Sequence, residues 1–252
     1  MQNVKFVLAI IFLLLTACGP VQLATLPPSP QPIFAVIPPS LDPISDALHS
    51  CANNQQEIAV IVSESPTSPS DIGNERLSLW LGEKPDIESY AIPLAQDELI
   101  IIVNQANPID EMSLEQIRSL FEGQVENWSD LTDYQHPVEI WTYSASNLLH
   151  QIFQSELFDG LRFSLLAQIA PTAESMVSAV ASDPGALGYV LRSWITDGVT
   201  SIQIESDSDL ALQQPILALT NTEPQGGLRA FMVCLQSGIG QTTLLERYSP
   251  MK

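Results

Sequence analysis

Hydrophobic residues in the first half of the chain fall into short runs, separated by proline, serine and other turn-forming residues. Runs of this length and composition predict β-strands. The predicted strands are Ile33–Ile37, Glu57–Val62, Leu77–Leu81 and Glu98–Val103. Between the first two, the hydrophobic positions from Leu41 to Leu48 predict a helix that reaches about Cys51. Strands that alternate with helical segments indicate an α/β fold.

Two serines stand after predicted strands. Ser40 follows the strand that Pro38-Pro39 ends, and Ser65 lies in the polar loop after the second strand. Ligand sites of α/β sheets lie at the carboxyl ends of the strands, so both serines are candidate ligand-binding residues. Each serine alone is also explained as a turn or helix-capping residue.

A third candidate lies between the strand predicted at Val138–Thr142 and a helix. The helix is indicated by hydrophobic positions at helical spacing, namely Leu148, Leu149, Ile152, Phe153 and Leu157. A helix start presents unpaired N–H groups and a partial positive charge, which together favour an anion. We therefore predict an oxyanion pocket at Ser144, Ala145 and Ser146. The alternative is that Ser144 or Ser146 only caps the helix.

The first residues of the chain predict a signal peptide. Lys5 supplies a positive charge, and Phe6 to Leu15 are hydrophobic without interruption. This run is too short to cross a bilayer, which needs about 20 hydrophobic residues. Leu15-Thr16-Ala17-Cys18 resembles a bacterial lipobox, which implies cleavage before Cys18 and attachment of lipid to its sulfur. Secretion with an incidental cysteine is the alternative.

The expected mature chain begins with a tether. Residues 1–17 form the predicted lipoprotein signal peptide, and residues 18–32 contain a cluster of prolines typical of an extended linker. The lipid alone would then hold the folded part at the extracytoplasmic face of the cell membrane. About 220 residues follow the tether, which is enough for one large domain or two lobes.

Acidic residues greatly outnumber basic ones. The sequence has 9 Lys and Arg against 29 Asp and Glu, for a net charge of −20. Removal of Lys5 with the signal peptide leaves 8 basic residues against 29 acidic ones, which gives −21. Such a chain cannot neutralise a phosphate backbone, so we expect no nucleic-acid partner. The acidic surface favours solubility and does not indicate a ligand.

Two cysteines remain after lipidation of Cys18. Cys51 and Cys234 are an even number in an oxidising compartment, so we expect a disulfide that joins an early helix to a late one. Two inert buried thiols are the alternative, because spacing alone does not show pairing.

Motifs of catalysis and metal binding are missing from the sequence. It contains neither a Gly-x-Ser-x-Gly motif nor a phosphate loop that ends in Gly-Lys. His49, His136 and His150 are too far apart for a metal motif. His150 lies near Ser146, but we expect an exposed or edge residue of its helix rather than a general base. We therefore predict no enzyme activity, no cofactor and no metal ion.

Several blocks of the chain resemble the phosphate-binding family of ABC-transporter solute-binding proteins. The first blocks are Ile100–Asn104, Asn107-Pro108, Met112–Ile117, Leu120–Gly123 and Asn127–Leu131. Within them, Ser113 and Gln116 predict a helix capping box. One hydrophobic face of that helix would consist of Leu114, Ile117, Leu120 and Phe121.

Two later blocks resemble the same family. One corresponds to its helix, tight turn and buried strand: Met176-Val177, Val180 and Asp183–Val190. The other corresponds to its closing strand and paired C-terminal helices: Pro215–Leu219, Glu223-Pro224, Phe231 and Ser237–Gln241. Leu228, Phe231, Met232 and Leu235 are spaced to bury one face of the first of these helices. The resemblance covers the chain from about Leu94 to Tyr248.

The resemblance implies the type II periplasmic-binding fold, in which two α/β lobes are joined by two hinge crossings and clamp a ligand between them. Lobe I would contain residues 33–103 and 201–252, and lobe II residues 104–200. Closure of such lobes around a ligand is a hinge motion.

The resemblance also places the ligand loop. In the family this loop usually reads Ser-Gly-Thr, with an arginine a few residues earlier. Ser144-Ala145-Ser146 occupies that position here, and Thr142 or a neighbour stands in place of arginine. Pro38-Pro39-Ser40 replaces the family's glycine- and serine-rich opening loop. Hydroxyl and backbone N–H groups therefore remain as possible donors to an anion. The arginine side chain, which would donate two charge-assisted hydrogen bonds to it, is missing. Arg192 either reaches the cleft from another direction or pairs with a surface carboxylate.

These features predict a monomeric, lipid-anchored solute-binding protein that binds phosphate or a similar small anion and delivers it to an ABC permease. The second hypothesis is a family member with a lost or changed ligand, acting as a cell-surface sensor or interaction module. The altered loop favours the second hypothesis. The retained hydroxyls and helix start favour the first, which we adopt.

Overall fold

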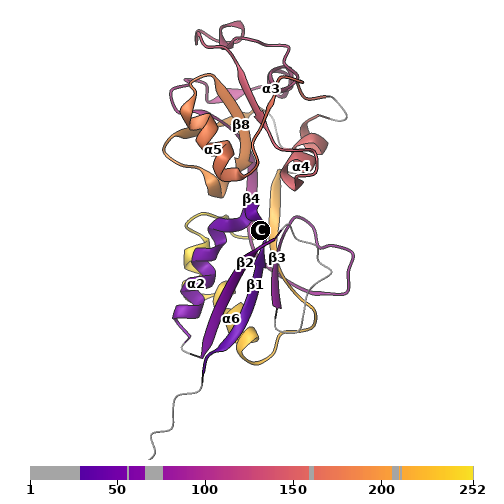
Figure 1. Ribbon diagram of the computed structural model, residues 1–252, viewed down its shortest axis with the longest axis vertical. Helices are drawn as coiled ribbons and strands as arrows, with labels where there is room; N and C mark the ends of the chain where they lie inside the picture. Colours follow the sequence, from indigo (N-terminus) through magenta and orange to yellow (C-terminus); the bar gives the residue numbers. More distant parts are fainter. Residues whose placement is uncertain are drawn as a thin grey trace, which may run out of the picture.

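The computed structural model describes residues 29–55, 57–65, 76–158, 162–205, 210 and 212–251. The predicted signal peptide, Cys18 and most of the predicted tether lie outside these residues. No helix in the described part of the chain is long and hydrophobic enough to span a bilayer. Figure 1 shows two groups of elements along the long axis, here called the lower and upper lobes, with β4 passing between them.

The lower lobe is built on strands in the order β2-β1-β3-β10-β4. Their bounds are β1 (Gln31–Ile37), β2 (Ile58–Glu64), β3 (Arg76–Leu81), β4 (Tyr90–Asn104) and β10 (Gln213–Thr220). β1 is parallel to β2 and β3, whereas β10 is antiparallel to β3 and β4. Ile33, Ala35 and Ile37 are buried and alternate with more exposed residues, as expected for a strand that buries one face.

Four helical segments pack in the lower lobe: η1 (Pro39–Ile44), α2 (Ser45–Asn53), α6 (Gly226–Gln236) and α7 (Gly238–Leu244). The helix predicted after Ser40 is therefore a 3₁₀ turn followed by an α-helix. Pro43 lies inside the 3₁₀ turn, and a proline disfavours α-helical backbone angles at the residue before it, which is consistent with an α-helix that begins only at Ser45. Leu41, Ile44 and Leu48 are fully buried.

The predicted disulfide is present. Cys51 of α2 is bonded to Cys234 of α6, across 183 residues of sequence. In the chain-entropy view, closing a loop of this length stabilises the fold by up to about 5 kcal/mol. Gly240 of α7 lies against the bridge, where a Cβ would come within 2.4 Å of Cys51 Sγ. The absence of a side chain at Gly240 thus lets α7 pack onto the two bonded helices.

β4 is the long strand that connects the two lobes. Residues Tyr90–Glu98 pair with β10 in the lower lobe, and Leu99–Asn104 pair with β8 and β9 in the upper lobe. The sequence predicted only the end of this strand, from Glu98, because Pro93 and Asp97 interrupt the hydrophobic pattern. The structure tolerates Pro93 next to a register shift in the pairing with β10, where a missing N–H is least costly.

The upper lobe is built around β8, whose six residues are all buried. Its strands are β5 (Glu111–Met112), β6 (Glu139–Thr142), β7 (Gln168–Ile169), β8 (Ala186–Leu191) and β9 (Val199–Ile204). Its helical segments are α3 (Leu114–Phe121), η3 (Trp128–Asp130), α4 (Leu148–Leu157), α5 (Ala173–Ser182) and η4 (Arg192–Trp194). β6 runs parallel to β7 and β8, so the carboxyl end of β6 leads into the loop before α4.

The predicted packing of α3 is confirmed. Ser113 and Gln116 form the capping box in both directions, and Ile117, Leu120 and Phe121 are buried. Phe121 contacts the rings of Phe153, Phe158, Phe163 and Tyr189 at edge-on angles, so α3 anchors the aromatic core of the upper lobe.

The chain crosses between the lobes twice, once within β4 and once between β9 and β10. The two crossings are joined by a hydrogen bond from the Leu99 N–H to the Leu212 carbonyl, at 2.9 Å. Because β4 belongs to both sheets, the lobe boundaries at residues 103/104 and 200/201 stay predictions.

Candidate functional site

The predicted oxyanion loop connects β6 to α4. Ser144, Ala145 and Ser146 are exposed, and the hydroxyl oxygens of the two serines lie 3.3 Å apart. The loop is closed by a hydrogen bond from the Asn147 N–H to the Ser144 carbonyl. The structure thus presents two neighbouring hydroxyl groups to solvent immediately before a helix start.

Neither serine caps α4. The cap is Asn147, which has extended backbone angles and whose side-chain oxygen accepts from the Leu149 N–H at 2.8 Å. The serine-cap interpretation of the sequence is therefore wrong, because asparagine caps helices as well as serine does. In consequence the hydroxyls of Ser144 and Ser146 are not occupied by the helix backbone.

A buried polar cluster fixes both ends of this loop. The Tyr189 hydroxyl of β8 lies 2.8 Å from Thr142 Oγ1 and 2.8 Å from His150 Nδ1. Thr142 Oγ1 and His150 Nδ1 are themselves 3.1 Å apart. Thr142 ends β6 and His150 lies in the first turn of α4, so one phenol oxygen connects the residues on either side of the loop.

The position of His150 corrects the sequence analysis, which expected an exposed or edge residue. His150 is buried, with its ring 4.7 Å from that of Phe163. Burial lowers the pKa of His150, which keeps its ring neutral. The ring serves as a structural hydrogen-bond partner rather than as a general base.

Tyr189 is also held by ring contacts. Its ring is stacked on Phe153 at 3.9 Å and meets Tyr143 edge-on at 5.3 Å. Burial raises the pKa of Tyr189 to about 12, so the hydroxyl keeps its proton in the physiological range. This role of Tyr189 was not predicted from the sequence. The signal for it in the sequence is a tyrosine in the centre of a strand whose other residues are all hydrophobic or glycine.

Ser40 and Ser65, the two candidate ligand-binding residues of the lower lobe, lie at the carboxyl ends of its parallel strands. Ile37 and Glu64 are paired at the ends of the parallel strands β1 and β2, and the Ser65 N–H donates to the Ile37 carbonyl at 3.0 Å. Ser40 is half-buried in η1, just beyond the same end of β1. Its carbonyl accepts from the indole N–H of Trp194 at 2.7 Å, so Ser40 contacts the upper lobe.

Arg192 does not supply the missing cation. Its Nε and Nη2 both donate to Glu98 Oε2, at 2.9 and 2.6 Å. The alternative of a surface arginine paired with a carboxylate is therefore confirmed. The loop from Tyr143 to Asn147 contains no basic residue, so any anion there would be bound by neutral donors and the helix start.

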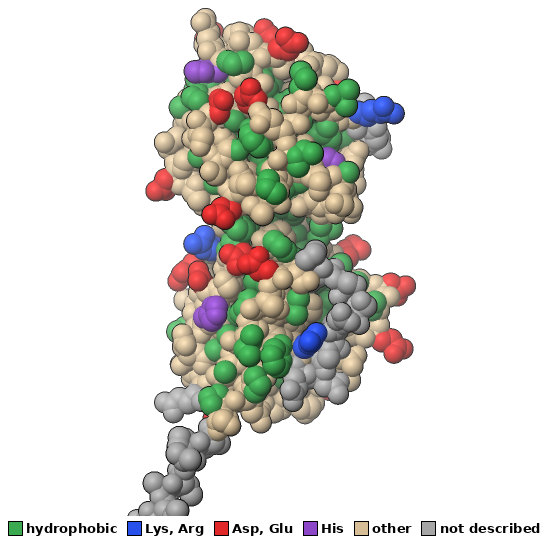
Figure 2. All heavy atoms as spheres, viewed as in Figure 1, with side chains coloured by type: hydrophobic (Ala, Val, Ile, Leu, Met, Phe, Trp, Pro, Cys, Tyr) green, Lys and Arg blue, Asp and Glu red, His purple; other side chains and the backbone are tan. Residues whose placement is uncertain are grey.

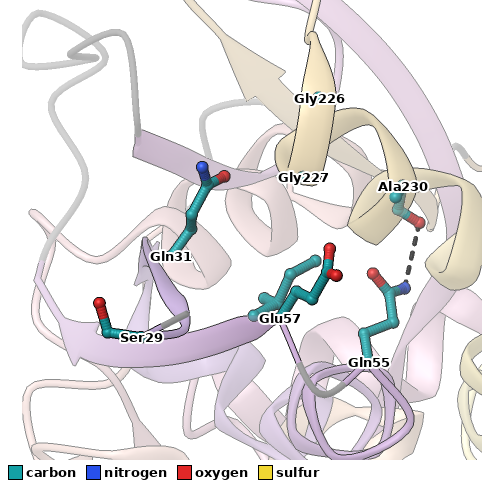
Figure 3. Close-up of a pocket in the computed structure, with 8 residues that line it drawn as sticks. Ser29, Gln31, Gln55, Glu57, Gly226, Gly227 and Ala230 are labelled. Carbon is teal, nitrogen blue, oxygen red and sulfur yellow. Dashed lines mark hydrogen bonds between the residues drawn. The ribbon is translucent and has the colours of Figure 1, made fainter. Parts of the chain in front are cut away.

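A separate cavity lies at the other end of the lower lobe. It has a volume of about 800 Å³ and is lined in part by Gln31, Gln55, Glu57, Gly226 and Gly227. Figure 3 shows Gln55 hydrogen-bonded to the Ala230 carbonyl, at 3.3 Å, and the Glu57 carboxylate in the opening. This cavity lies at the amino ends of β1 and β2, opposite the edge that carries Ser40 and Ser65, so we do not assign the predicted ligand to it.

Among the described residues, no three His, Cys, Asp or Glu side chains are grouped so that they could hold a metal ion. Two α/β lobes with two strand crossings form the type II periplasmic-binding fold, and the family that matches the chain is one of binding proteins rather than enzymes. The family comparison agrees, since the family described as "PBP superfamily domain" matches residues 45–229. The chain belongs to that superfamily.

A curated protein with a similar sequence is also a binding protein. Over 139 residues the chain is 24% identical to the phosphate-binding protein PstS of Bacillus subtilis (strain 168). This match covers 53% of the chain and 45% of PstS, so the chain matches less than half of that relative's length.

Two of the solved structures that match the chain come from phosphate transport systems. A putative phosphate ABC transporter substrate-binding protein with bound phosphate from Clostridium perfringens matches with a TM-score of 0.75 and 16% identity, over 88% of this chain and all of that one. An ABC-type phosphate transport receptor from Vibrio cholerae matches with a TM-score of 0.64 and 21% identity, over 87% of this chain and all of that one. At these identities the likeness shows the fold alone.

Proposed function

We propose that this chain binds phosphate or a similar small oxyanion between its lobes and delivers it to an ABC permease. The solute-binding fold and the PstS relative support this proposal. The observation that carries it is the capping of α4 by Asn147, because it leaves the Ser144 and Ser146 hydroxyls available beside the helix start.

The proposed ligand contacts come from both lobes. In the upper lobe they are the hydroxyls of Ser144 and Ser146 and the backbone N–H groups around Ala145. In the lower lobe they are Ser40 and Ser65, at the carboxyl edge of the sheet. The site contains no cation, so its affinity comes from short hydrogen bonds to a charged oxygen, each worth about 1.5–3 kcal/mol.

The proposed location is the extracytoplasmic face of the membrane. Cleavage before Cys18 and lipidation of its sulfur would leave the prolines of residues 18–32 as the spacer between the anchor and the lobes. Mass spectrometry of the N-terminal peptide tests this part directly: a lipid-modified Cys18 supports the anchor, and an unmodified or uncleaved terminus rejects it.

Calorimetric titration of the mature domain with phosphate, sulfate and molybdate tests the ligand. We expect saturable heat with at least one of these anions and roughly a hundredfold loss of affinity in Ser144→Ala/Ser146→Ala. Ser155→Ala is the matched control, since Ser155 is exposed on the same helix and its hydroxyl donates to the Ile152 carbonyl. No heat with any anion would reject the proposal and favour the sensor or interaction-module hypothesis, which the missing arginine supports.

A further inference from the structure

Asp97 is a buried carboxyl group at the point where β4 leaves the lower sheet. Only 3% of the residue is exposed. Its Oδ1 accepts from the N–H groups of Glu98, at 2.8 Å, and of Ser193, at 3.3 Å. Its Oδ2 is buried without a hydrogen-bond partner in the described structure. A buried carboxylate oxygen without a donor is costly, so this position needs an explanation.

Two other buried hydroxyls near Asp97 also have no partner in the described structure. They are Ser193 Oγ, in η4, and Tyr248 Oη, in the C-terminal segment. The Asp97 charge raises the pKa of Tyr248, and the Ser193 side chain lowers the pKa of Asp97, so the three groups interact. The Gln96–Ser249 backbone pair and the hydrogen bond from the Ser193 N–H to Asp97 Oδ1 bring the three chain segments together, so these buried polar groups lie near one another.

The same place is where the upper lobe contacts the lower one. η4 follows β8 of the upper lobe and packs on α5. Its Trp194 donates to the Ser40 carbonyl of the lower lobe, and its Ser193 carbonyl accepts from Arg247 Nη1, at 3.2 Å. Any rotation of one lobe against the other would change these contacts.

The charged groups around Asp97 are few. Arg192 of η4 lowers the pKa of Asp97 but is bound to Glu98 of β4. Arg247 and Tyr248 lie on the C-terminal side, and Asp42 of η1 is close enough to raise the pKa of Tyr248. Burial is the largest effect and raises the pKa of Asp97 from 3.8 to about 6.

We propose that Asp97, Ser193 and Tyr248 form a proton-sensitive latch between the lobes. With Asp97 protonated, its Oδ2–H becomes a donor to one of the facing hydroxyl oxygens, and η4 is held against the lower lobe. Ionisation of Asp97 places a negative charge in the buried cluster, where the cost of burial outweighs the hydrogen bond that Ser193 gives to the carboxylate. The latch is then weakened, and the lobes are free to change their relative orientation. The latch does not depend on which ligand the protein binds.

The pH dependence follows from the sign of the shift. Because the pKa of Asp97 is raised in the folded protein, its stabilising effect is complete below pH 3.8 and is lost as the pH rises through about 6. The latched arrangement is thus favoured in acid and released near neutral pH.

Trp194 reports on the latch directly, because its indole N–H is bonded across the lobes. The mature protein is labelled with 5-fluorotryptophan, and the Trp194 resonance in the ¹⁹F spectrum is assigned with Trp194→Phe. We expect this resonance to shift with a midpoint near pH 6 in the wild type and to lose that transition in Asp97→Asn. Asp130→Asn, an exposed aspartate, and His49→Gln, which removes a histidine of α2, should keep it.

Small-angle X-ray scattering tests whether the lobes move. We expect the wild-type profile to change between pH 5 and pH 8, and the profile of Asp97→Asn at pH 8 to match the wild type at pH 5. Ser193→Ala removes a group that lowers the pKa of Asp97, so it should raise the midpoint of the Trp194 transition. The proposal is overturned by a transition that persists in Asp97→Asn, by an unchanged midpoint in Ser193→Ala, or by a wild-type profile that is independent of pH.

Discussion

The Tyr189 hydroxyl lies 2.8 Å from His150 Nδ1, at the centre of the cluster that holds the Ser144–Ser146 loop. It contacts Thr142 at the same distance, so a single oxygen ties the end of β6 to the first turn of α4. A loop fixed at both ends loses little conformational freedom when a ligand binds, which favours affinity.

Tyr189→Phe should test this role. Loss of the hydroxyl leaves Thr142, His150 and the Tyr143 N–H with fewer partners, and we expect the free energy of unfolding to fall by about 1–3 kcal/mol. Chemical denaturation measures this change, and calorimetry with the bound anion should show weaker affinity. Tyr134→Phe is the matched control, since the Tyr134 hydroxyl donates to the Pro184 carbonyl in an exposed hydrogen bond. Equal effects of the two substitutions would contradict the assigned role.

Because Asn147 caps α4, its substitution should affect stability more than substitution of Ser144 or Ser146. Asn147→Ala should lower the free energy of unfolding by about 1 kcal/mol, because α4 loses the acceptor of its Leu149 N–H. Ser144→Ala and Ser146→Ala should each change it by less than about 0.5 kcal/mol. Thermal denaturation of the three variants side by side is the measurement. A larger loss of unfolding free energy in either serine variant would indicate that this serine caps α4. Its hydroxyl would then not be available to the proposed ligand.

The disulfide should contribute strongly to stability. Cys51→Ala/Cys234→Ala is expected to lose about 2–5 kcal/mol, because the unfolded chain regains the freedom of a long loop. Reduced wild-type protein is the control for the lost sulfur atoms and should be destabilised to a similar extent. A melting temperature unaffected by either treatment would show that the bridge adds nothing to the fold.

Asp97 should make stability depend on pH in an unusual direction for a carboxyl group. The rise in its pKa from 3.8 to about 6 corresponds to about 3 kcal/mol, present in acid and lost as the pH rises through 6. Asp97→Asn should therefore be more stable than the wild type at pH 8, and the difference should shrink or reverse at pH 4. Urea denaturation across this range measures it. A variant less stable than the wild type at pH 8 would show that the buried charge is favourable.

The sequence predicted the elements whose patterns are local. The run Ile33–Ile37 alternates in the way a half-buried strand requires, and Ser113 with Gln116 marks the start of α3 by a hydrogen-bond exchange within one turn. From the sequence, a disulfide between Cys51 and Cys234 and two free thiols were about equally plausible. Only the packing of α2 against α6 decides between them.

The missed features depend on contacts between distant residues. Pro93 and Asp97 look like a break before a strand that starts at Glu98. In the structure β4 runs through them, because β10 pairs with one side and η4 covers the carboxyl group. His150 is buried because Tyr189, 39 residues away, meets its ring nitrogen. Asn147 rather than a serine caps α4, and one local rule could not choose among three good capping residues.

Figure 2 shows acidic side chains on both lobes and only a few basic ones on the visible face. Attraction of an anion from a distance is therefore not part of the proposal, and the site has to act at short range through fixed donors. For this reason the location of binding is a more direct test than its strength.

The most direct measurement is a titration of the ¹⁵N-labelled mature domain with phosphate, followed by amide resonances. If phosphate binds between the lobes, we expect saturable shifts of the Ser144, Ala145 and Ser146 amides, together with shifts of the Ser40 and Ser65 amides in the lower lobe. Shifts confined to Gly226 and Gly227, beside the cavity at the far end of the lower lobe, would contradict the proposal, as would a spectrum that phosphate leaves unchanged.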